Sequence, residues 1–367
     1  MKILFAGGVT GGHIAPGVAL AEEVVSNNPG CEVLFASVAN EVEERMIARR
    51  GLGLVKVTAN PSGPAGKLLG IPAAWLRARR LLASFQPDVV VGLGGGASVG
   101  PALAAISSGT PLVLLEQNAI PGRATRRLAA RAAQICCQFE RAAEELGGCA
   151  QLTGSPIRNE IAGSVLLDKA EPRVFFGLDR ERPTLLVMGG SQGAHAINTV
   201  MMEAARHLAG EVQVIHLAGA EDGPALAEAY RDADVAAHVT SFFETMHLAY
   251  AAADLALSRA GGMSIAELAV AGLPAILVPY PHAKDDHQRA NARDAVQQGW
   301  AVMADPGEFD ADLAADLIRS LLGDPTQLEA MERKALSSVR REAAEEIINT
   351  IYEAAESRGE TVEAPTP

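Results

Sequence analysis

The sequence is poor in cysteine and in long apolar runs, and each shortage excludes a class of protein. Only four cysteines occur among 367 residues, with no Cys-x-x-Cys pair, so we expect reduced thiols in a cytosolic protein. No apolar run approaches the roughly 20 residues that cross a bilayer. The N-terminus enters a strand pattern too early for a signal peptide. Any contact with a membrane is therefore expected to be peripheral.

Positive charge is scarce as well. The net charge is −13 and the isoelectric point is about 5.1, so nucleic acid is not an expected partner. Apolar residues make up 49% of the chain and charged residues 20%, which is typical of a globular protein. The length allows two domains, each with a sizeable core.

Short apolar runs alternate with helical patterns in both halves of the chain, which predicts two doubly wound α/β domains with parallel sheets. The predicted strands cover residues 3–6, 32–36, 53–58, 89–92, 112–115, 134–137, 151–153, 184–188, 212–217, 236–240, 255–258 and 275–279. The main predicted helices cover residues 15–27, 41–50, 73–84, 100–108, 122–130 and a long segment, 327–357.

The expected domain boundary follows the break at Gly154-Ser-Pro-Ile-Arg158. We assign residues 1–158 to an N-terminal domain and residues 159–342 to a C-terminal domain. The end of the last helix, about 343–357, is expected to pack back on the first domain, and residues 358–367 are expected to be disordered.

Two strand patterns each lead into a glycine loop and then a helix pattern. The loops are Gly7-Gly-Val-Thr-Gly-Gly-His13 and Gly189-Gly-Ser-Gln-Gly-Ala-His195. Backbone N–H groups at a helix start face the ligand, and the helix dipole favours negative charge. The second loop can thus hold a diphosphate without a metal ion; a structural glycine turn is the alternative. Neither loop has the spacing of a P-loop or of a dinucleotide fold.

Two residues are candidates for proton transfer. His13 ends the first glycine loop, where the helix start favours a neutral imidazole that can accept a proton. Glu116 follows a predicted strand and suits a base or a partner for a sugar hydroxyl. Capping or loop bonding is the alternative for both. His195 has the matching place in the second loop, but a diphosphate site needs no base, so we expect His195 to be structural.

Other polar segments also follow predicted strands, where open α/β sheets bind ligands. A third glycine run, residues 92–97, includes Gly94, Gly95 and Gly96, which we expect to contact a ligand; by the family resemblance given below, this ligand would be the acceptor. Glu267 lies in the first turns of a helix pattern, where its carboxylate can chelate two ribose hydroxyls. The loop 281–288 has two His and two Asp without regular ligand spacing, which favours a hydroxyl-rich ligand over a metal ion.

One basic segment stands out in this acidic chain. Residues 67–80 carry four basic residues, no acidic residue and several large apolar ones. That mixture predicts an element lying on an anionic membrane surface, with an ordinary surface helix as the alternative. The residues expected to dock there are Lys67, Leu68, Leu69, Ile71, Trp75, Arg77, Arg79 and Arg80.

Together these segments resemble glycosyltransferase family 28, in a match from Ile3 to about Asn291. The resemblance rests on residues 7–13, 87–92, 116–118, 154–158, 189–194, 259–267 and 286–288. It implies the GT-B fold, with two Rossmann-like domains and a cleft between them. This chain departs from the family pattern at Val9, Leu115 and Ser155, all in the acceptor half.

The resemblance also implies an activity at the cytoplasmic face of the bacterial plasma membrane, without a cofactor. N-acetylglucosamine would pass, with inversion, from UDP-GlcNAc to the 4-hydroxyl of the N-acetylmuramoyl group of lipid I (undecaprenyl-pyrophosphoryl-MurNAc-pentapeptide), giving lipid II in peptidoglycan synthesis. The N-terminal domain would bind the acceptor and the C-terminal domain the donor.

By the same resemblance, His13 is the candidate base and Glu116 its support or rival. The residues implied to bind UDP-GlcNAc are Thr10, Gly11, Gly12, Asn118, Arg158, Ser191, Gln192, Phe243, Gly262, Met263, Ser264, Glu267, His287 and Gln288. Three other hypotheses stay open: a GT-B transferase with another lipid acceptor, a UDP-GlcNAc 2-epimerase, and an inactive sugar-nucleotide sensor.

Overall fold

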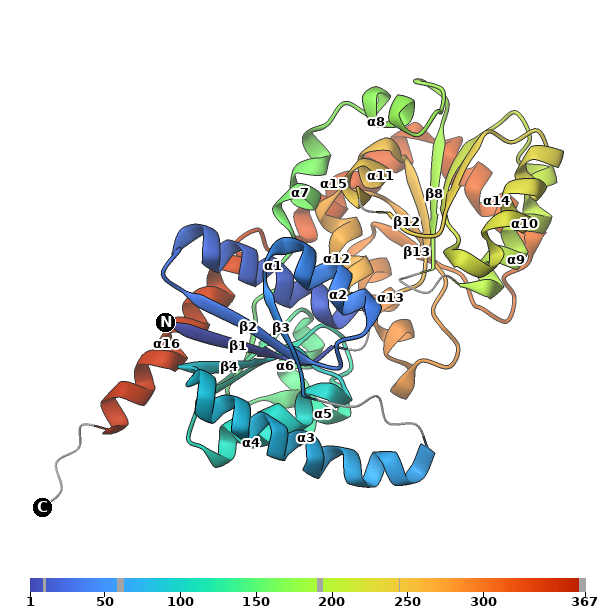
Figure 1. Ribbon diagram of the computed structural model, residues 1–367. Coiled ribbons are helices and arrows are strands. Elements are labelled where there is room, and N and C mark those ends of the chain that lie inside the picture. Colours follow the sequence, from blue (N-terminus) through green and yellow to red (C-terminus); the bar gives the residue numbers. More distant parts are fainter. Residues whose placement is uncertain (9–10, 58–62, 190–193, 244, 363–367) are drawn as a thin grey trace, which may run out of the picture. The chain divides into compact units, whose positions relative to one another are not determined.

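The computed structural model describes residues 1–8, 11–57, 63–189, 194–243 and 245–362 (Figure 1). The chain divides into two compact units. Unit 1 comprises Met1–Arg158 and the segment from Arg340 onward, and unit 2 comprises Asn159–Val339. Each unit contains a parallel sheet with helices on both faces, so the predicted fold class is confirmed.

Unit 1 has a seven-stranded sheet in the order β3-β2-β1-β4-β5-β6-β7. Its strands are β1 (Lys2–Ala6), β2 (Glu32–Ser37), β3 (Gly53–Lys56), β4 (Val89–Gly92), β5 (Leu112–Glu116), β6 (Gln134–Cys137) and β7 (Ala150–Leu152). Its helices are α1 (Gly11–Asn27), α2 (Glu41–Ile47), α3 (Gly63–Phe85), α4 (Val99–Ser107), α5 (Arg123–Leu128), α6 (Glu140–Leu146) and α16 (Ala343–Val362).

Helices α1 and α16 cover one face of this sheet, and α3 and α4 cover the other (Figure 1). Phe5 and Phe35 stack at 5.1 Å between ring centroids in neighbouring strands. Ile347 and Ile351 of α16 join the same buried cluster. The C-terminal helix therefore completes the core of unit 1, although it follows the whole of unit 2 in the sequence.

Unit 2 has a six-stranded sheet in the order β10-β9-β8-β11-β12-β13. Its strands are β8 (Thr184–Met188), β9 (Gln213–Leu217), β10 (Ala237–Thr240), β11 (Leu255–Ser258), β12 (Ala275–Leu277) and β13 (Ala301–Met303). Its helices are α7 (Asn159–Ala162), α8 (Ala170–Phe175), α9 (His195–Ala204), α10 (Gly219–Asp232), α11 (Met246–Ala252), α12 (Gly262–Val270), α13 (His287–Gln298), α14 (Ala311–Leu322) and α15 (Pro325–Ser338).

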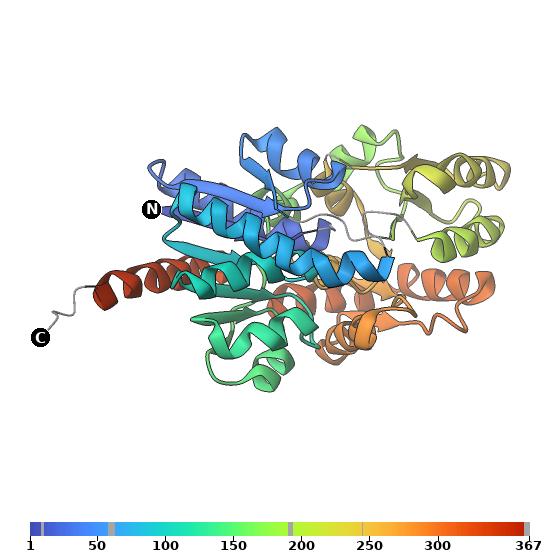
Figure 2. The same cartoon turned by 60° about the horizontal axis from the view of Figure 1, so that its bottom comes forward.

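Several elements differ from the sequence analysis. Strand β13 was not predicted. Helix α3, at the front of Figure 2, begins at Gly63 rather than near Ala73. The single helix predicted over 327–357 is wrong, because the backbone becomes extended at Val339 and the chain passes there from unit 2 to unit 1. The last helix also continues through Val362, beyond the predicted end at Ser357.

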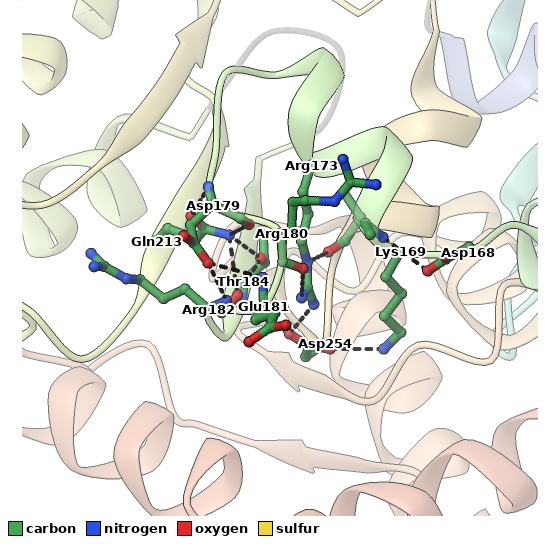
Figure 3. A network of polar contacts seen from close by, with 12 residues as sticks. Asp168, Lys169, Arg173, Asp179, Arg180, Glu181, Arg182, Thr184, Gln213 and Asp254 are labelled. Atoms are coloured by element: carbon green, nitrogen blue, oxygen red, sulfur yellow. Dashed lines mark hydrogen bonds and ion pairs between the residues drawn. The ribbon is translucent and has the colours of Figure 1, made fainter.

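A network of charged groups joins the segment before β8 to the sheet of unit 2 (Figure 3). Asp254 accepts hydrogen bonds from Arg173 Nη2 at 2.6 Å, Lys169 Nζ at 2.8 Å and the Thr184 backbone N at 2.8 Å. Arg173, only 5% exposed, also donates to the carbonyl oxygens of Ala252 and Arg180. Because its charge is satisfied, Arg173 can be buried near the beginning of β8 and β11.

A second polar network lies beneath α9 in unit 2. His216, in the middle of β9, is completely buried between the Tyr230 hydroxyl and the Asn198 side chain, at 2.9 and 3.0 Å. Burial lowers the pKa of His216 to about 3. The imidazole is therefore neutral in the folded protein wherever the pH is well above that value.

We expect the Asp254→Ala variant to lose about 3 kcal/mol of unfolding free energy, because Arg173 would keep a buried charge without its carboxylate. The matched control is Glu171→Ala, which removes the exposed ion pair with Arg180 and should change stability by less than about 0.5 kcal/mol. Urea unfolding followed by fluorescence of Trp300, in a Trp75→Phe background, reports on unit 2. Equal losses in the two variants would contradict a stabilising role for this network.

Acidification should destabilise unit 2 through His216. The pKa of His216 is about 3 in the folded protein and near 6.5 in the unfolded chain. At a pH between these two values, the unfolded chain binds a proton at His216 and the folded protein does not. The free energy of unfolding therefore falls as the pH falls through this range. From pH 7 to pH 5 the loss should be about 2 kcal/mol greater in the wild type than in His216→Gln. If the unfolding free energies of the wild type and of His216→Gln, measured in the same fluorescence assay, fell equally between pH 7 and pH 5, the link between His216 and acid stability would be disproved.

Candidate active site

In unit 1, parallel strand pairing brings three predicted loops to one edge of the sheet. Ala6 at the end of β1 pairs with Gly92 of β4, and Gly92 in turn pairs with Leu114 of β5. Leu93 then donates a backbone hydrogen bond to the Ala6 carbonyl at 2.8 Å. The loops after these strands are therefore neighbours at the carboxyl edge, where open α/β sheets bind ligands.

Glycines allow two of these loops to approach closely. The φ angles of Gly7 and Gly94 are 132° and 85°, in the region that side chains disfavour. A Cβ on Gly7 would lie 2.8 Å from the Gly94 carbonyl oxygen, too close for any other residue. The first and third glycine runs of the sequence thus form one surface.

The imidazole of His13 lies against this surface. A Cβ on Gly94 would be 3.3 Å from His13 Cδ2, and a Cβ on Gly95 would be 3.5 Å from His13 Nε2. The structure therefore brings the predicted base together with two of the predicted acceptor-contacting glycines. Gly96 follows them as the first residue of a short 3-10 helix, Gly96–Ser98.

Glu116 organises the turn that follows β5. Its Oε1 accepts hydrogen bonds from the backbone N and side-chain Nδ2 of Asn118, at 3.1 and 3.3 Å. Its Oε2 accepts from Gly122 N at 2.9 Å and Thr125 Oγ1 at 2.7 Å. The side chain is only 4% exposed, so these four donors compensate a buried charge. This geometry favours a positioning role, in which Glu116 orients Asn118, over proton abstraction.

In unit 2 the same construction places three segments together. Ser258 at the end of β11 pairs with Met188 of β8 and with Leu277 of β12. The segments after these strands include the second glycine loop, the start of α12 and the loop before α13. Two predicted diphosphate residues, Ser191 and Gln192, lie outside the described residues, as does Thr10 of the first loop.

Glu267 lies on α12 with one carboxylate oxygen held in place. Its Oε2 accepts a hydrogen bond from the Tyr250 hydroxyl at 2.8 Å, and Tyr250 is only 3% exposed. Gly262, Met263 and Ser264 form the first turn of the same helix. The four predicted donor residues of this segment therefore share one short helix, and Tyr250 of α11 fixes the carboxylate among them.

The loop before α13 is tightly bent. Asp285 and Asp286 both have φ of 53°, a left-handed conformation that Asp tolerates better than most residues. His287 Nδ1 donates to the Lys284 carbonyl at 2.7 Å, and Gln288 Oε1 accepts from the Tyr280 backbone N at 2.8 Å. These bonds fix the start of α13, on which two predicted sugar-contacting side chains lie.

Sequence reasoning gave no role to Arg259, which the structure places between two of these segments. The guanidinium is 7% exposed and donates through Nη1 to the carbonyls of Val278 and Pro279, at 3.1 and 3.2 Å. It also lies 5.6 Å from the centre of the Tyr280 ring. Arg259 therefore joins the end of β11 to the segment after β12. The sequence did offer a signal for such a role, because Arg259 directly follows the apolar strand β11.

Phe243, one of the residues implied to bind UDP-GlcNAc, is fixed by aromatic packing. Its ring stacks on His238 of β10 at 6.0 Å and meets Phe176 edge-on at 5.5 Å. Phe176 is 5% exposed and directly follows α8. The backbone at Phe243 is thus held by residues from two other parts of unit 2.

The predicted residues fall in both units. Those assigned to the base and the acceptor lie in unit 1, together with four of the predicted donor contacts that the structure describes: Gly11, Gly12, Asn118 and Arg158. The other described donor contacts lie in unit 2: Phe243, Gly262, Met263, Ser264, Glu267, His287 and Gln288.

Comparisons with known proteins agree with this division. The glycosyltransferase family 28 N-terminal domain matches residues 3–137, and the glycosyltransferase family 28 C-terminal domain matches residues 184–349. The crystal structure of MurG from Acinetobacter baumannii has a TM-score of 0.76 and 26% identity, covering 96% of this chain and 99% of that one. A UDP-GlcNAc 2-epimerase from Neisseria meningitidis shares the fold, with a TM-score of 0.70 at 15% identity over 96% of this chain and 100% of that one.

Two curated relatives carry the name UDP-N-acetylglucosamine–N-acetylmuramyl-(pentapeptide) pyrophosphoryl-undecaprenol N-acetylglucosamine transferase. The protein from Geobacter metallireducens is 37% identical over 362 residues, 95% of this chain and 97% of its own. That from Myxococcus xanthus is 38% identical over 361 residues, 95% of this chain and 91% of its own. With both family models matched and such relatives along nearly its whole length, this chain belongs to glycosyltransferase family 28.

Proposed function

We propose that this protein transfers N-acetylglucosamine from UDP-GlcNAc to the 4-hydroxyl of the N-acetylmuramoyl group of lipid I, forming lipid II with inversion at the anomeric carbon. The observation that carries the proposal is the similarity, over 95% of the chain, to relatives named for this transfer. The two carboxyl-edge surfaces described above supply the chemistry that the reaction needs.

Unit 2 is the proposed donor site. The diphosphate of UDP-GlcNAc would bind at the start of α9, through Ser191 and Gln192, where backbone donors and the helix dipole favour negative charge. Glu267 would accept hydrogen bonds from the ribose hydroxyls. Since the Tyr250 hydroxyl already occupies Oε2, the carboxylate is held in one orientation for this contact. Fixed donors at the diphosphate would stabilise charge as UDP leaves.

Unit 1 is the proposed acceptor site. The acceptor hydroxyl would lose its proton to His13 as its oxygen attacks the anomeric carbon, while the electron pair of the breaking C1–O bond passes to the diphosphate. The closeness of the His13 ring to Gly94 and Gly95 supports this assignment, because the imidazole then lies at the edge where the acceptor loops meet. Glu116 would act by holding the turn that carries Asn118.

We expect His13→Ala to lower turnover at least 100-fold, the lower end of what a positioned general base contributes, without changing the affinity for UDP-GlcNAc. The assay is UDP release from UDP-GlcNAc with and without a soluble lipid I analogue. Acceptor-dependent release by the wild type supports the proposed reaction. Release only with another lipid acceptor, or formation of the 2-epimer, would overturn it, and near-normal turnover of His13→Ala would reassign the base.

We further propose that α3 docks the enzyme on an anionic membrane. Within the part of the chain that the structure describes, no helix combines the length and apolarity needed to span a bilayer. Ala74 and Ala78 are buried, whereas Ile71 and Leu76 are 41% and 47% exposed and so contribute little to the core. Next to them Arg79 lies over the Trp75 ring, at 5.1 Å from its centre. Apolar groups beside cations suit an interfacial helix.

Of the other predicted docking residues, Arg77 and Arg80 are also exposed. The side chains of Lys67, Leu68 and Leu69 lie outside the described residues.

Binding to vesicles that contain anionic lipid should therefore weaken several-fold between low and physiological salt, since exposed charges are screened. A double variant, Arg79→Ala with Arg80→Ala, should reduce binding at low salt. Arg333→Ala, which removes an exposed cation from α15, is the matched control and should bind as the wild type does. If vesicle binding changed neither with salt concentration nor in the double variant, the proposed role of α3 in docking would be contradicted.

A further inference from the structure

The polar network beneath α9 leads to the surface at the proposed donor site. His195, the first residue of α9, directly follows the second glycine loop and is 80% exposed. Its Nδ1 lies 3.0 and 3.1 Å from the two carboxylate oxygens of Asp222, which is only 14% exposed. Asp222 in turn contacts Asn198, the residue that bonds to buried His216. A continuous path thus joins the interior of unit 2 to an exposed imidazole.

The hydrogen-bond donors along this path can be assigned one by one. Asn198 Nδ2 lies 2.8 Å from the Ala218 carbonyl and 2.7 Å from Asp222 Oδ2, and both of these groups are acceptors. The Asn198 amide must therefore present Oδ1 to His216, whose Nε2 carries the hydrogen. His216 Nδ1 then accepts from the Tyr230 hydroxyl. Burial supports this assignment, since it raises the pKa of Tyr230 and lowers that of His216.

This chain of donors ends on Asp222 and fixes its state. The Asn198 amide is the main reason that the pKa of Asp222 is lowered, and the bond with His195 adds to the effect. An ionised Asp222 requires a hydrogen on His195 Nδ1. The other ring nitrogen, Nε2, is then left for a partner outside the network. The buried groups therefore hold one exposed ring in one orientation.

The bond with Asp222 ties α9 to α10, which is a structural role, and it leaves the rest of the His195 ring exposed. Ala194, the residue before α9, has no side chain that can cap the helix. A histidine at a helix N-terminus gains nothing from the dipole, which favours anions there. An imidazole that carries a hydrogen on both ring nitrogens can donate one hydrogen bond to Asp222 and the other to an anion bound at the same helix start.

We propose that His195 is a further ligand-binding residue of the donor site. With Nδ1–H donated to Asp222, a second proton on Nε2 would let the ring, as an imidazolium between two anions, donate a hydrogen bond to the diphosphate of UDP-GlcNAc and of the departing UDP. Asp222, Asn198 and His216 are positioning residues that set the orientation of its ring. This inference rests on the proposed function. It also revises the expectation from the sequence that His195 is structural.

The test compares the affinities of the full-length protein for UDP and for uridine, which lacks the diphosphate. His195→Ala should weaken UDP binding about tenfold, the size of a charge-assisted hydrogen bond, and leave uridine binding within twofold. His195→Arg supplies a permanent cationic donor and should restore most of the UDP affinity. Asp222→Asn should weaken UDP binding several-fold with uridine unchanged, because the ring loses its anionic partner.

The matched control is His207→Ala. His207 follows the carboxyl end of the same helix and also lies near an aspartate, with 3.6 Å between its Nε2 and Asp312 Oδ1. This variant should bind UDP as the wild type does. Thermal midpoints of all variants separate loss of binding from loss of folding, and His195→Ala changes an exposed side chain.

The results distinguish this inference from the proposed function. If the wild type binds UDP and releases it in an acceptor-dependent reaction, but His195→Ala keeps the wild-type ratio of UDP to uridine affinity, the inference is wrong and the proposed function stands. A parallel loss of both affinities would likewise indicate a structural role. A wild type that binds no UDP would overturn both proposals.

Discussion

The parallel pairing of the strands is the constraint on which both candidate surfaces depend. Because β1, β4 and β5 run in the same direction and in register, the loops that follow them begin at one edge of the sheet. The same holds for β8, β11 and β12 in unit 2. Residues far apart in the sequence, such as Gly7 and Gly94, meet only for this reason, and their lack of side chains then allows backbone contact.

Carboxylates hold these edges in shape. Glu116 bonds the turn after β5, and Asp222 bonds the first residue of α9. Buried Glu43 accepts from the Ser37 hydroxyl and from the Asn40 backbone N, beside the position of Gly8. Each buried anion is compensated by several donors, as the cost of removing a charge from water requires. These acidic groups at the candidate sites therefore hold loops and helix starts in position. For this reason an acidic residue directly after a strand is weak evidence for a catalytic base.

The sequence predicted much of the fold because buried parallel strands are continuous apolar runs. Residues 184–188 and 255–258 coincide with β8 and β11. The prediction failed at the passage between the units, because nothing in the Glu- and Ala-rich segment before Val339 marks the change from one unit to the other. It also missed strand β13. The spacing of apolar residues predicts helices and strands, but it does not show where the chain passes from one unit to the other.

The candidate site divides in the same way. Glycine loops after strands have a local signature, so their position at the sheet edges could be predicted from the sequence. The partners of the functional side chains could not, because they come from other elements: Tyr250 for Glu267, Asp222 for His195, Gly95 for His13. Sequence reasoning therefore found positions, whereas the orientation and charge of each group became clear only from the folded chain.

The central claim is that the diphosphate of a sugar nucleotide binds where β8 gives way to α9. A crystal structure of the protein with UDP-GlcNAc tests it most directly. Our account predicts the diphosphate at the start of α9, within hydrogen-bonding distance of His195 Nε2, with the ribose at Glu267. A diphosphate bound instead at residues 7–13 of unit 1, with the start of α9 unoccupied, would contradict it.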